Sequence, residues 1–299
     1  MIEEFEYNGK AMGTEYSIAI VCESKQLSLE LYKIGKNLID DYEKKFSRFL
    51  TTSELSLLNK HKNLVVSEEF LKVTQQAYKL FVKTKGIFNP LVQISRHGYN
   101  KNFLDIQDNE IFLNNEDYDF DFSEVIIDKD NSQIFLNKGQ NLDYGGFLKG
   151  YLSEIIAEKI KSNSSLVKGV IVNIGGDIHT KGLDRNGNRF VFSIYNPILK
   201  NEDIIVTLYN QSLATSGTYK RTWMILNKEF NHILDKTGNK NPESDIISAS
   251  IINKNGGVSE AYTKVFLSVG CEKALEILED ESISFAVIKN NGKIIKNFI

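Results

Sequence analysis

The chain has 299 residues, 41% of them hydrophobic and 25% charged, a balance typical of a globular protein that can bury a sizeable core. The formal net charge of -3 is spread along the chain, which argues against a nucleic-acid-binding protein. The two cysteines, Cys22 and Cys271, are far apart and form no Cys-x-x-Cys pair, so a zinc site or a disulfide framework is not expected.

No apolar run is long enough to span a membrane. The first six residues are acidic and lack the basic and then apolar pattern of a secretion signal. The sequence therefore predicts a cytoplasmic protein, a prediction that a signal removed upstream would overturn.

The first half of the chain alternates between strand and helix patterns. A strand is predicted at 14–22, and apolar residues at helical spacing predict helices at 27–46 and 68–83. Residues 99–140 are rich in Asn and Asp and predict surface hairpins and loops, whereas 147–160 predicts an amphipathic helix.

Strand patterns dominate the second half, with two helices near its end. Strands are predicted at 170–172, 190–194, 204–209, 223–226, 246–252, 285–288 and 293–298, and helices at 260–267 and 272–278. Because the predicted strands and helices do not alternate in regular βαβ units, the fold class is predicted as α+β with mixed or antiparallel sheets and packed helices. No Pro-rich boundary or repeat divides the chain, so a single domain over 1–299 is expected.

Two Gly-Gly segments carry the strongest chemical signal. Asn-Ile-Gly-Gly-Asp at 173–177 follows an apolar run, and its turn lets the backbone approach a ligand closely. Asp143 begins the other segment, in which Gly145 and Gly146 open a helix. A helix N-terminus suits a pyrophosphate, and Lys149 in the first turn opposes the helix dipole unless an anion binds nearby. An ordinary surface lysine is the alternative.

Two further segments follow downstream. Ala-Thr-Ser-Gly at 214–217 could contact a ligand through Ser216, although a simple turn would explain it equally. His-Ile-Leu-Asp at 232–235 contains His232, which on residue type alone is more often structural than functional.

Taken in this order, the segments resemble the FAD:protein FMN transferases, the ApbE-like family. Further segments fit the pattern: Ala-Met-Gly-Thr at 11–14, Phe-Ser-Arg-Phe at 46–49, Ser-Glu-Leu at 53–55, Gly-Ile-Phe-Asn-Pro at 86–90 and Ser-Glu-Ala-Tyr-Thr-Lys at 259–264. The resemblance implies a two-lobed architecture. It also implies transfer of FMN from FAD to a Thr or Ser hydroxyl of a target flavoprotein, with release of AMP and with Mg²⁺ as the metal.

The resemblance also implies site residues. Catalytic roles fall on His232, Lys149 and Asp235. FAD contacts fall on Met12, Phe49, Ile87, Phe88, Asn89, Asp143, Lys149, Gly175, Gly176, Ser216, Gly217, His232 and Ile233. The metal ligands would be the carbonyl of Gly146 together with Glu260 and Thr263, with Lys264 at a further ligand position.

The metal block departs from the family. Relatives have Ala-Asp-Ala-x-x-Thr, in which Asp and Thr bind Mg²⁺, whereas this chain has Glu260 and Lys264 at those positions. A protonated lysine has no lone pair and cannot be a ligand. Two hypotheses remain open: Lys264 supplies the positive charge itself, or it forms an ordinary i,i+4 pair with Glu260 and the metal site is lost. Asn89 and Thr218 also replace acids, so negative charge around the ligand is reduced.

Three functions are therefore compared. The first is an FAD:protein FMN transferase acting on a flavoprotein with a Ser/Thr-Gly-Ala-Thr/Ser-like acceptor motif. The alternatives are a non-catalytic FAD carrier or sensor, and an FAD pyrophosphatase that yields FMN and AMP.

Overall fold

The computed structural model of the protein describes residues 1–298 except 92–119, 226–227, 239 and 280–282. Its largest sheet is antiparallel, with strands in the spatial order β1-β2-β6-β7-β10-β13-β14-β15. These strands are β1 (Glu3–Ala11), β2 (Thr14–Cys22), β6 (Gly169–Ile174), β7 (Asp177–Gly182), β10 (Ser212–Gly217), β13 (Ile246–Asn253), β14 (Ser284–Lys289) and β15 (Ile294–Lys296).

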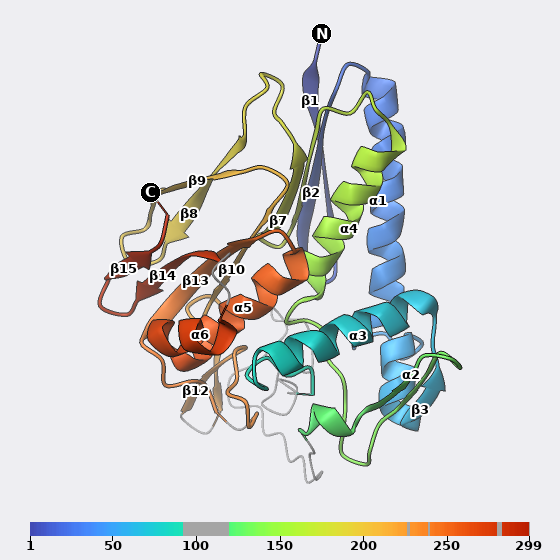
Figure 1. Cartoon of the computed structure of the whole chain (residues 1–299), viewed down its shortest axis with the longest axis vertical. Coiled ribbons are helices and arrows are strands. Elements are labelled where there is room, and N and C mark those ends of the chain that lie inside the picture. The colour runs from blue at the N-terminus through green and yellow to red at the C-terminus, as the bar shows by residue number, and fades with distance from the viewer. Residues whose placement is uncertain (92–119, 226–227, 239, 280–282, 299) are drawn as a thin grey trace.

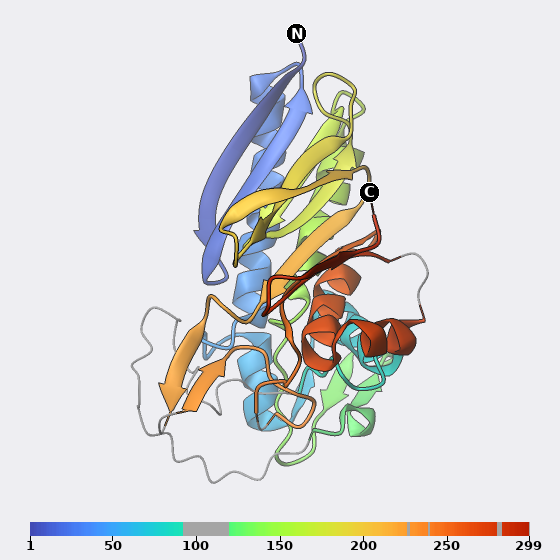
Figure 2. The ribbon, with the colours of Figure 1, turned by 90° about the vertical axis from the view of Figure 1, so that its left-hand side faces the viewer.

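Three helices cover one face of this sheet (Figures 1 and 2). They are α1 (Lys25–Phe46), α4 (Leu148–Asn163) and α5 (Gly256–Val269). Helix α4 packs on β6 and β7 with α1 beside it, and α5 packs on β10 and β13. Helix α4 also packs against α5, so the start of α4 lies between the sheet and a second helix.

A hairpin of β8 (Phe190–Asn196) and β9 (Asn201–Leu208) covers part of the opposite face. Strand β13 contributes to the packing on both faces of the sheet, because neighbouring side chains of a strand point in opposite directions. Ile251 packs in the main core on the helix side, whereas Ile252 packs with the hairpin residue Ile204.

Smaller elements lie at the end of the molecule where α1 ends (Figure 1). They are α2 (Glu54–His61), β3 (Asn63–Val65), α3 (Glu68–Lys83), a 3-10 turn (Phe122–Glu124), β4 (Ile126–Asp128), β5 (Gln133–Phe135), β11 (Thr222–Ile225), β12 (Lys228–Asn231) and α6 (Cys271–Leu278).

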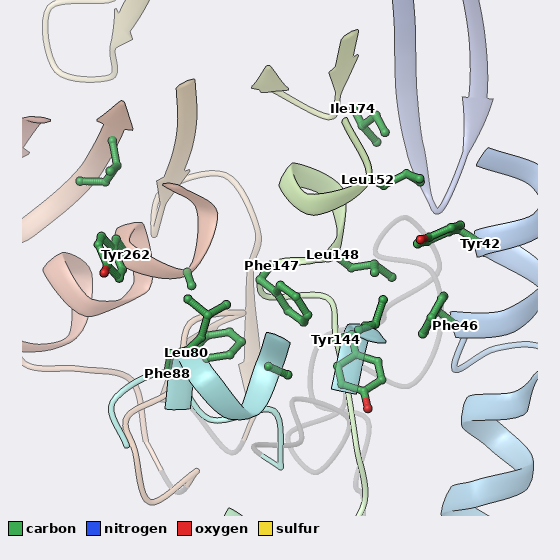
Figure 3. Packing of buried hydrophobic residues seen from close by; sticks show 14 of the residues in the cluster. Tyr42, Phe46, Leu80, Phe88, Tyr144, Phe147, Leu148, Leu152, Ile174 and Tyr262 are labelled. Carbon is green, nitrogen blue, oxygen red and sulfur yellow. The ribbon is translucent and has the colours of Figure 1, made fainter. Parts of the chain in front are cut away.

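An aromatic cluster fixes the segment that leads into α4. Figure 3 shows Phe147 between Phe88 and Tyr144, with ring centroids 5.7 Å and 6.0 Å from Phe147. The Tyr144 hydroxyl hydrogen-bonds the Thr74 hydroxyl of α3 at 2.7 Å. Buried aromatic pairs of this kind contribute beyond their buried area, so α3 holds the start of α4 in place.

The α+β class and the antiparallel sheet are confirmed. Strands β1, β3, β7, β10 and β12 and helix α2 were not predicted, and Ser216 and Gly217 end strand β10 rather than form a turn. Of the hairpins predicted at 99–140, the β4–β5 pair is present and residues 99–119 lie outside the described residues. The division into two lobes stays a prediction. Within the described parts of the chain, each helix is too short or too polar to cross a membrane.

Candidate functional site

Two glycines bring α4 and α5 into backbone contact. A β-carbon on Gly150 would lie 2.4 Å from the carbonyl oxygen of Gly256, and one on Gly256 would lie 1.9 Å from the carbonyl oxygen of Gly150. Only glycine fits so close an approach. As a result the backbone N–H of Gly150 reaches across and donates to Oε2 of Glu260 on α5 at 2.9 Å.

Four charged side chains meet at this junction. The Nζ atom of Lys149 lies 2.9 Å from Oδ2 of Asp177 and also pairs with Oε1 of Glu260. The Nζ atom of Lys264 lies 3.3 Å from the same Glu260 oxygen. We call this group the charged quartet: Lys149 of α4, Asp177 of β7, and Glu260 and Lys264 of α5.

The charged quartet is largely removed from water. The Glu260 side chain is 0% exposed and that of Asp177 5%, whereas the lysines keep 21% (Lys149) and 17% (Lys264). Its two positive and two negative charges cancel. A surface ion pair is therefore the wrong description of Glu260 and Lys264, although their i,i+4 spacing is as expected.

In the charged quartet, burial and the attraction of the lysines shift the pKa values of the two carboxylates in opposite directions. Burial raises the pKa of Asp177 to about 6, an effect that the Glu260 charge increases and the Lys149 charge opposes. Burial would also raise the pKa of Glu260, but Lys149 and Lys264 lower it to about 2.

The two lysines respond in opposite directions. Burial alone would lower the pKa of Lys149, but the adjacent Asp177 and Glu260 carboxylates raise it above its ordinary value. Burial lowers the pKa of Lys264, and Glu260 offsets only part of that effect.

The Gly-Gly turn between β6 and β7 positions Asp177 in the charged quartet. Gly175 and Gly176 have φ angles of +64° and +96°, a region that favours glycine, and the Gly176 N–H donates to Oδ1 of Asn173 at 2.9 Å. Oδ1 of Asp177 is buried without a hydrogen-bond partner among the described residues. Asp177 is part of the Asn-Ile-Gly-Gly-Asp segment but was not among the predicted site residues.

Asp143 orders the turn before α4. Its Oδ1 accepts from the Gly145 N–H at 2.8 Å, and its Oδ2 accepts from Nη1 of Arg48 at 3.0 Å. The Arg48 guanidinium lies 4.8 Å from the centroid of the Phe49 ring, which is 46% exposed. Arg48 was also absent from the predicted site, although the Phe-Ser-Arg-Phe segment contains it.

His232 follows β12, and its Nδ1 is buried without a hydrogen-bond partner in the described chain. Burial, reinforced by the charges of Arg221 and Lys264, lowers the pKa of His232 to about 3. The Lys149 charge acts in the same direction, so the imidazole lies within electrostatic reach of the charged quartet and is neutral at neutral pH.

The described contacts of the other residues of this loop are structural. Oδ1 of Asp235 accepts from the Thr237 hydroxyl at 2.7 Å and from its N–H at 3.2 Å, which forms a turn after His232. The Ile233 side chain is buried in the main core.

Several predicted FAD contacts occupy packing or turn positions. Phe88 is buried against Phe147, and Ile87 packs at the edge of the core. Asn89 donates to the Phe120 carbonyl at 2.7 Å and accepts from the Leu91 N–H at 2.9 Å.

Other predicted residues lie in the strands and their turns. Met12 lies in the β1–β2 turn with φ +53°, and its N–H donates to Glu43 at 2.7 Å. The Ser216 hydroxyl accepts from Thr263 at 2.7 Å, and a β-carbon on Gly217 would lie 2.3 Å from the Tyr219 ring.

The residues present do not fit the magnesium ion that the resemblance implies. Both Glu260 oxygens already accept hydrogen bonds, and Lys264, at a ligand position, offers donors only. The buried Thr263 hydroxyl is bound to Ser216 and to the Glu260 carbonyl. In the part of the chain that the structure describes, no three His, Cys, Asp or Glu side chains form a group that could hold a metal.

Comparison with known proteins gives a consistent result. The sequence model of the ApbE family matches residues 12–288. A Klebsiella pneumoniae protein named FAD:protein FMN transferase is 27% identical over 58% of this chain and about half (53%) of its own length. A Vibrio cholerae protein of the same name is 23% identical over 96% of this chain and 87% of its own.

A solved structure shows the same fold. The ApbE protein from Thermotoga maritima superposes with a TM-score of 0.84 at 20% identity, over 99% of this chain and 97% of that one.

Proposed function

This chain belongs to the ApbE family, and we propose that it is an FAD:protein FMN transferase that acts on a threonine or serine of a target flavoprotein. The names of the curated relatives support this activity. The structural observation that carries the proposal is the pair of ammonium groups, Lys149 and Lys264, beside the start of α4. Cations and helix N-termini are the groups that bind a diphosphate.

The reaction joins the acceptor hydroxyl oxygen to the phosphorus of the FMN half of FAD. The bond from that phosphorus to the bridging oxygen breaks, and this oxygen leaves with AMP. The hydroxyl proton is released. Such a transfer depends mostly on positioning and on neutralising charge at the phosphates.

We assign the phosphates to Lys149 and the turn that Asp143 and Gly145 form. Neutral His232 has a buried ring nitrogen without a partner in the described residues, which suits it to form a hydrogen bond with the ligand. Asp235 supports the loop that carries His232. We assign Phe49, which is exposed and lies against the Arg48 guanidinium, to contact with the flavin ring.

The remaining predicted FAD contacts are kept as proposals, with the buried ones acting through packing. The magnesium requirement that the resemblance implies is not carried into this mechanism, because the residues do not fit the ion. The cytoplasmic location also stays a prediction.

The test measures two products together. The protein is incubated with FAD and an acceptor protein that carries a Ser/Thr-Gly-Ala-Thr/Ser-like motif, and AMP and covalently bound flavin are quantified. Equal amounts of both support the transferase. AMP with free FMN indicates a pyrophosphatase, and bound FAD without AMP indicates a carrier.

A further inference from the structure

The charged quartet contains an ammonium where the family pattern expects a metal ligand. Lys264 reaches Glu260 at 3.3 Å, and its side chain is 17% exposed, so it is neither a surface residue nor a sealed core residue. An ammonium has three donors, and the described contacts of Lys264 use one of them. The other two are available to a ligand.

The charge balance of the charged quartet depends on Lys264. Without Lys264, the remaining Lys149, Asp177 and Glu260 would leave one net negative charge beside a site for a diphosphate. Glu260 is fully buried, so solvent screens that charge poorly. Lys264 brings the group to neutrality and adds donors that face the same ligand.

We propose that the Lys264 ammonium replaces the divalent cation at this site, so that FAD binding and FMN transfer proceed without Mg²⁺. This inference rests on the proposed function for its catalytic part, but its binding part needs only FAD. In the transfer, the acceptor oxygen bonds to the FMN phosphorus and the bridging oxygen departs with AMP. Lys264 and Lys149 stabilise the charge on the phosphate oxygens while the hydroxyl proton is released.

Three substitutions of one side chain separate charge from metal ligation. Lys264→Met keeps length without charge, Lys264→Arg keeps charge, and Lys264→Thr supplies an oxygen ligand. We expect Lys264→Met to weaken FAD binding about tenfold or more, with or without Mg²⁺, because a hydrogen bond to a charged group is lost. We expect Lys264→Arg to retain most of the affinity. Lys264→Thr should bind FAD weakly in EDTA and recover in Mg²⁺.

Lys181 provides the matched control. It lies on β7, pairs with Glu158 of α4 and is 22% exposed, close to the value for Lys264. Lys181→Met should leave FAD affinity and its response to Mg²⁺ unchanged. A thermal melt of each variant shows whether it is folded. If Lys264→Met is not folded, Lys264→Arg is compared with the wild type instead.

The measurement is the Kd of FAD by calorimetry in EDTA and in Mg²⁺, followed by AMP release with the acceptor protein added under the same two conditions. The inference predicts that, in the wild type, neither the Kd of FAD nor AMP release changes when EDTA replaces Mg²⁺. A wild type whose FAD affinity or AMP release needs Mg²⁺ overturns the inference and leaves the proposed function standing. An unchanged FAD affinity in Lys264→Met also overturns it. AMP release absent throughout, with FAD binding as predicted, overturns the proposed function and supports the inference at the binding step.

Discussion

Gly150 of α4 and Gly256 of α5 lie backbone against backbone, and this contact lets the Gly150 N–H hold Oε2 of Glu260 at 2.9 Å. The position of Glu260, and through it those of Lys149 and Lys264, therefore depends on two residues without side chains. The site is built from helix packing as much as from its charges.

Gly150→Ala tests this dependence. The new β-carbon would lie 2.4 Å from a backbone oxygen that cannot rotate away, so we expect a loss of about 1–3 kcal/mol in the free energy of unfolding, together with weaker FAD binding. Urea unfolding and calorimetry measure the two effects. Gly35→Ala in α1 is the control, because its β-carbon would meet side chains rather than backbone, among them the movable Cδ1 ends of Ile18 and Ile160. Equal stability changes in both variants would contradict the packing argument.

Removal of Glu260 should be far more costly than removal of an exposed acid. Glu260→Ala leaves two partly buried ammonium groups without their shared partner, and we expect a loss of about 3–5 kcal/mol in the free energy of unfolding. Glu158→Ala removes the 52% exposed partner of Lys181 and should cost less than about 1 kcal/mol. Urea unfolding of both variants checks the order. Similar losses would mean that the charged quartet behaves as a surface group.

The elements and the site differ in how far the sequence could predict them. Helix α3 was predicted with its observed ends from the amphipathic pattern that runs from Glu68 to Lys83, and the structure adds that the Ser67 side chain caps it. Strand β1 was not predicted because it is an edge strand, and only Phe5, Tyr7 and Ala11 give its inner face apolar side chains.

The charged quartet could not be predicted as a group. Lys149 and Glu260 are 111 positions apart, and no periodic pattern in the sequence indicates that their side chains are in contact. The Gly-Gly-Asp segment pointed to a site, but the burial of Asp177 and its contact with Lys149 emerge only when β7 pairs with β6 beside α4. Likewise, only the structure shows that the Glu260–Lys264 pair is buried.

Asp143 and Arg48 should act as one unit. Each single alanine variant removes the same ion pair at the Gly145 turn, so we expect both to weaken FAD binding and the double variant to be scarcely worse than Asp143→Ala. Calorimetric Kd values for the four proteins complete the cycle. Strictly additive losses would show that Arg48 and Asp143 act independently, and an unchanged Kd in Asp143→Ala would remove Asp143 from the site.

His179 of β7 should make stability depend on pH. Its Nδ1 lies 2.6 Å from the Ser212 hydroxyl oxygen, and burial, reinforced by the Lys181 charge, lowers its pKa to about 3 from an ordinary 6.5. The unfolded chain therefore binds the extra proton first. The stabilisation is complete above pH 6.5 and is lost as the pH falls towards 3, at about 1.4 kcal/mol per unit.

Urea unfolding between pH 7 and pH 5 measures that slope. His179→Gln should lose stability less steeply with falling pH than the wild type. His61→Gln, at an exposed position of α2, should follow the wild type. A wild-type slope in His179→Gln would show that other groups cause the dependence.

The most direct test of the central claim is the intact mass of an acceptor flavoprotein after incubation with this protein and FAD. The account predicts that the acceptor gains the mass of one FMN residue, that AMP appears in equal amount, and that an acceptor with alanine at the modified threonine or serine gains nothing. An acceptor of unchanged mass while FAD is converted to free FMN and AMP would contradict it.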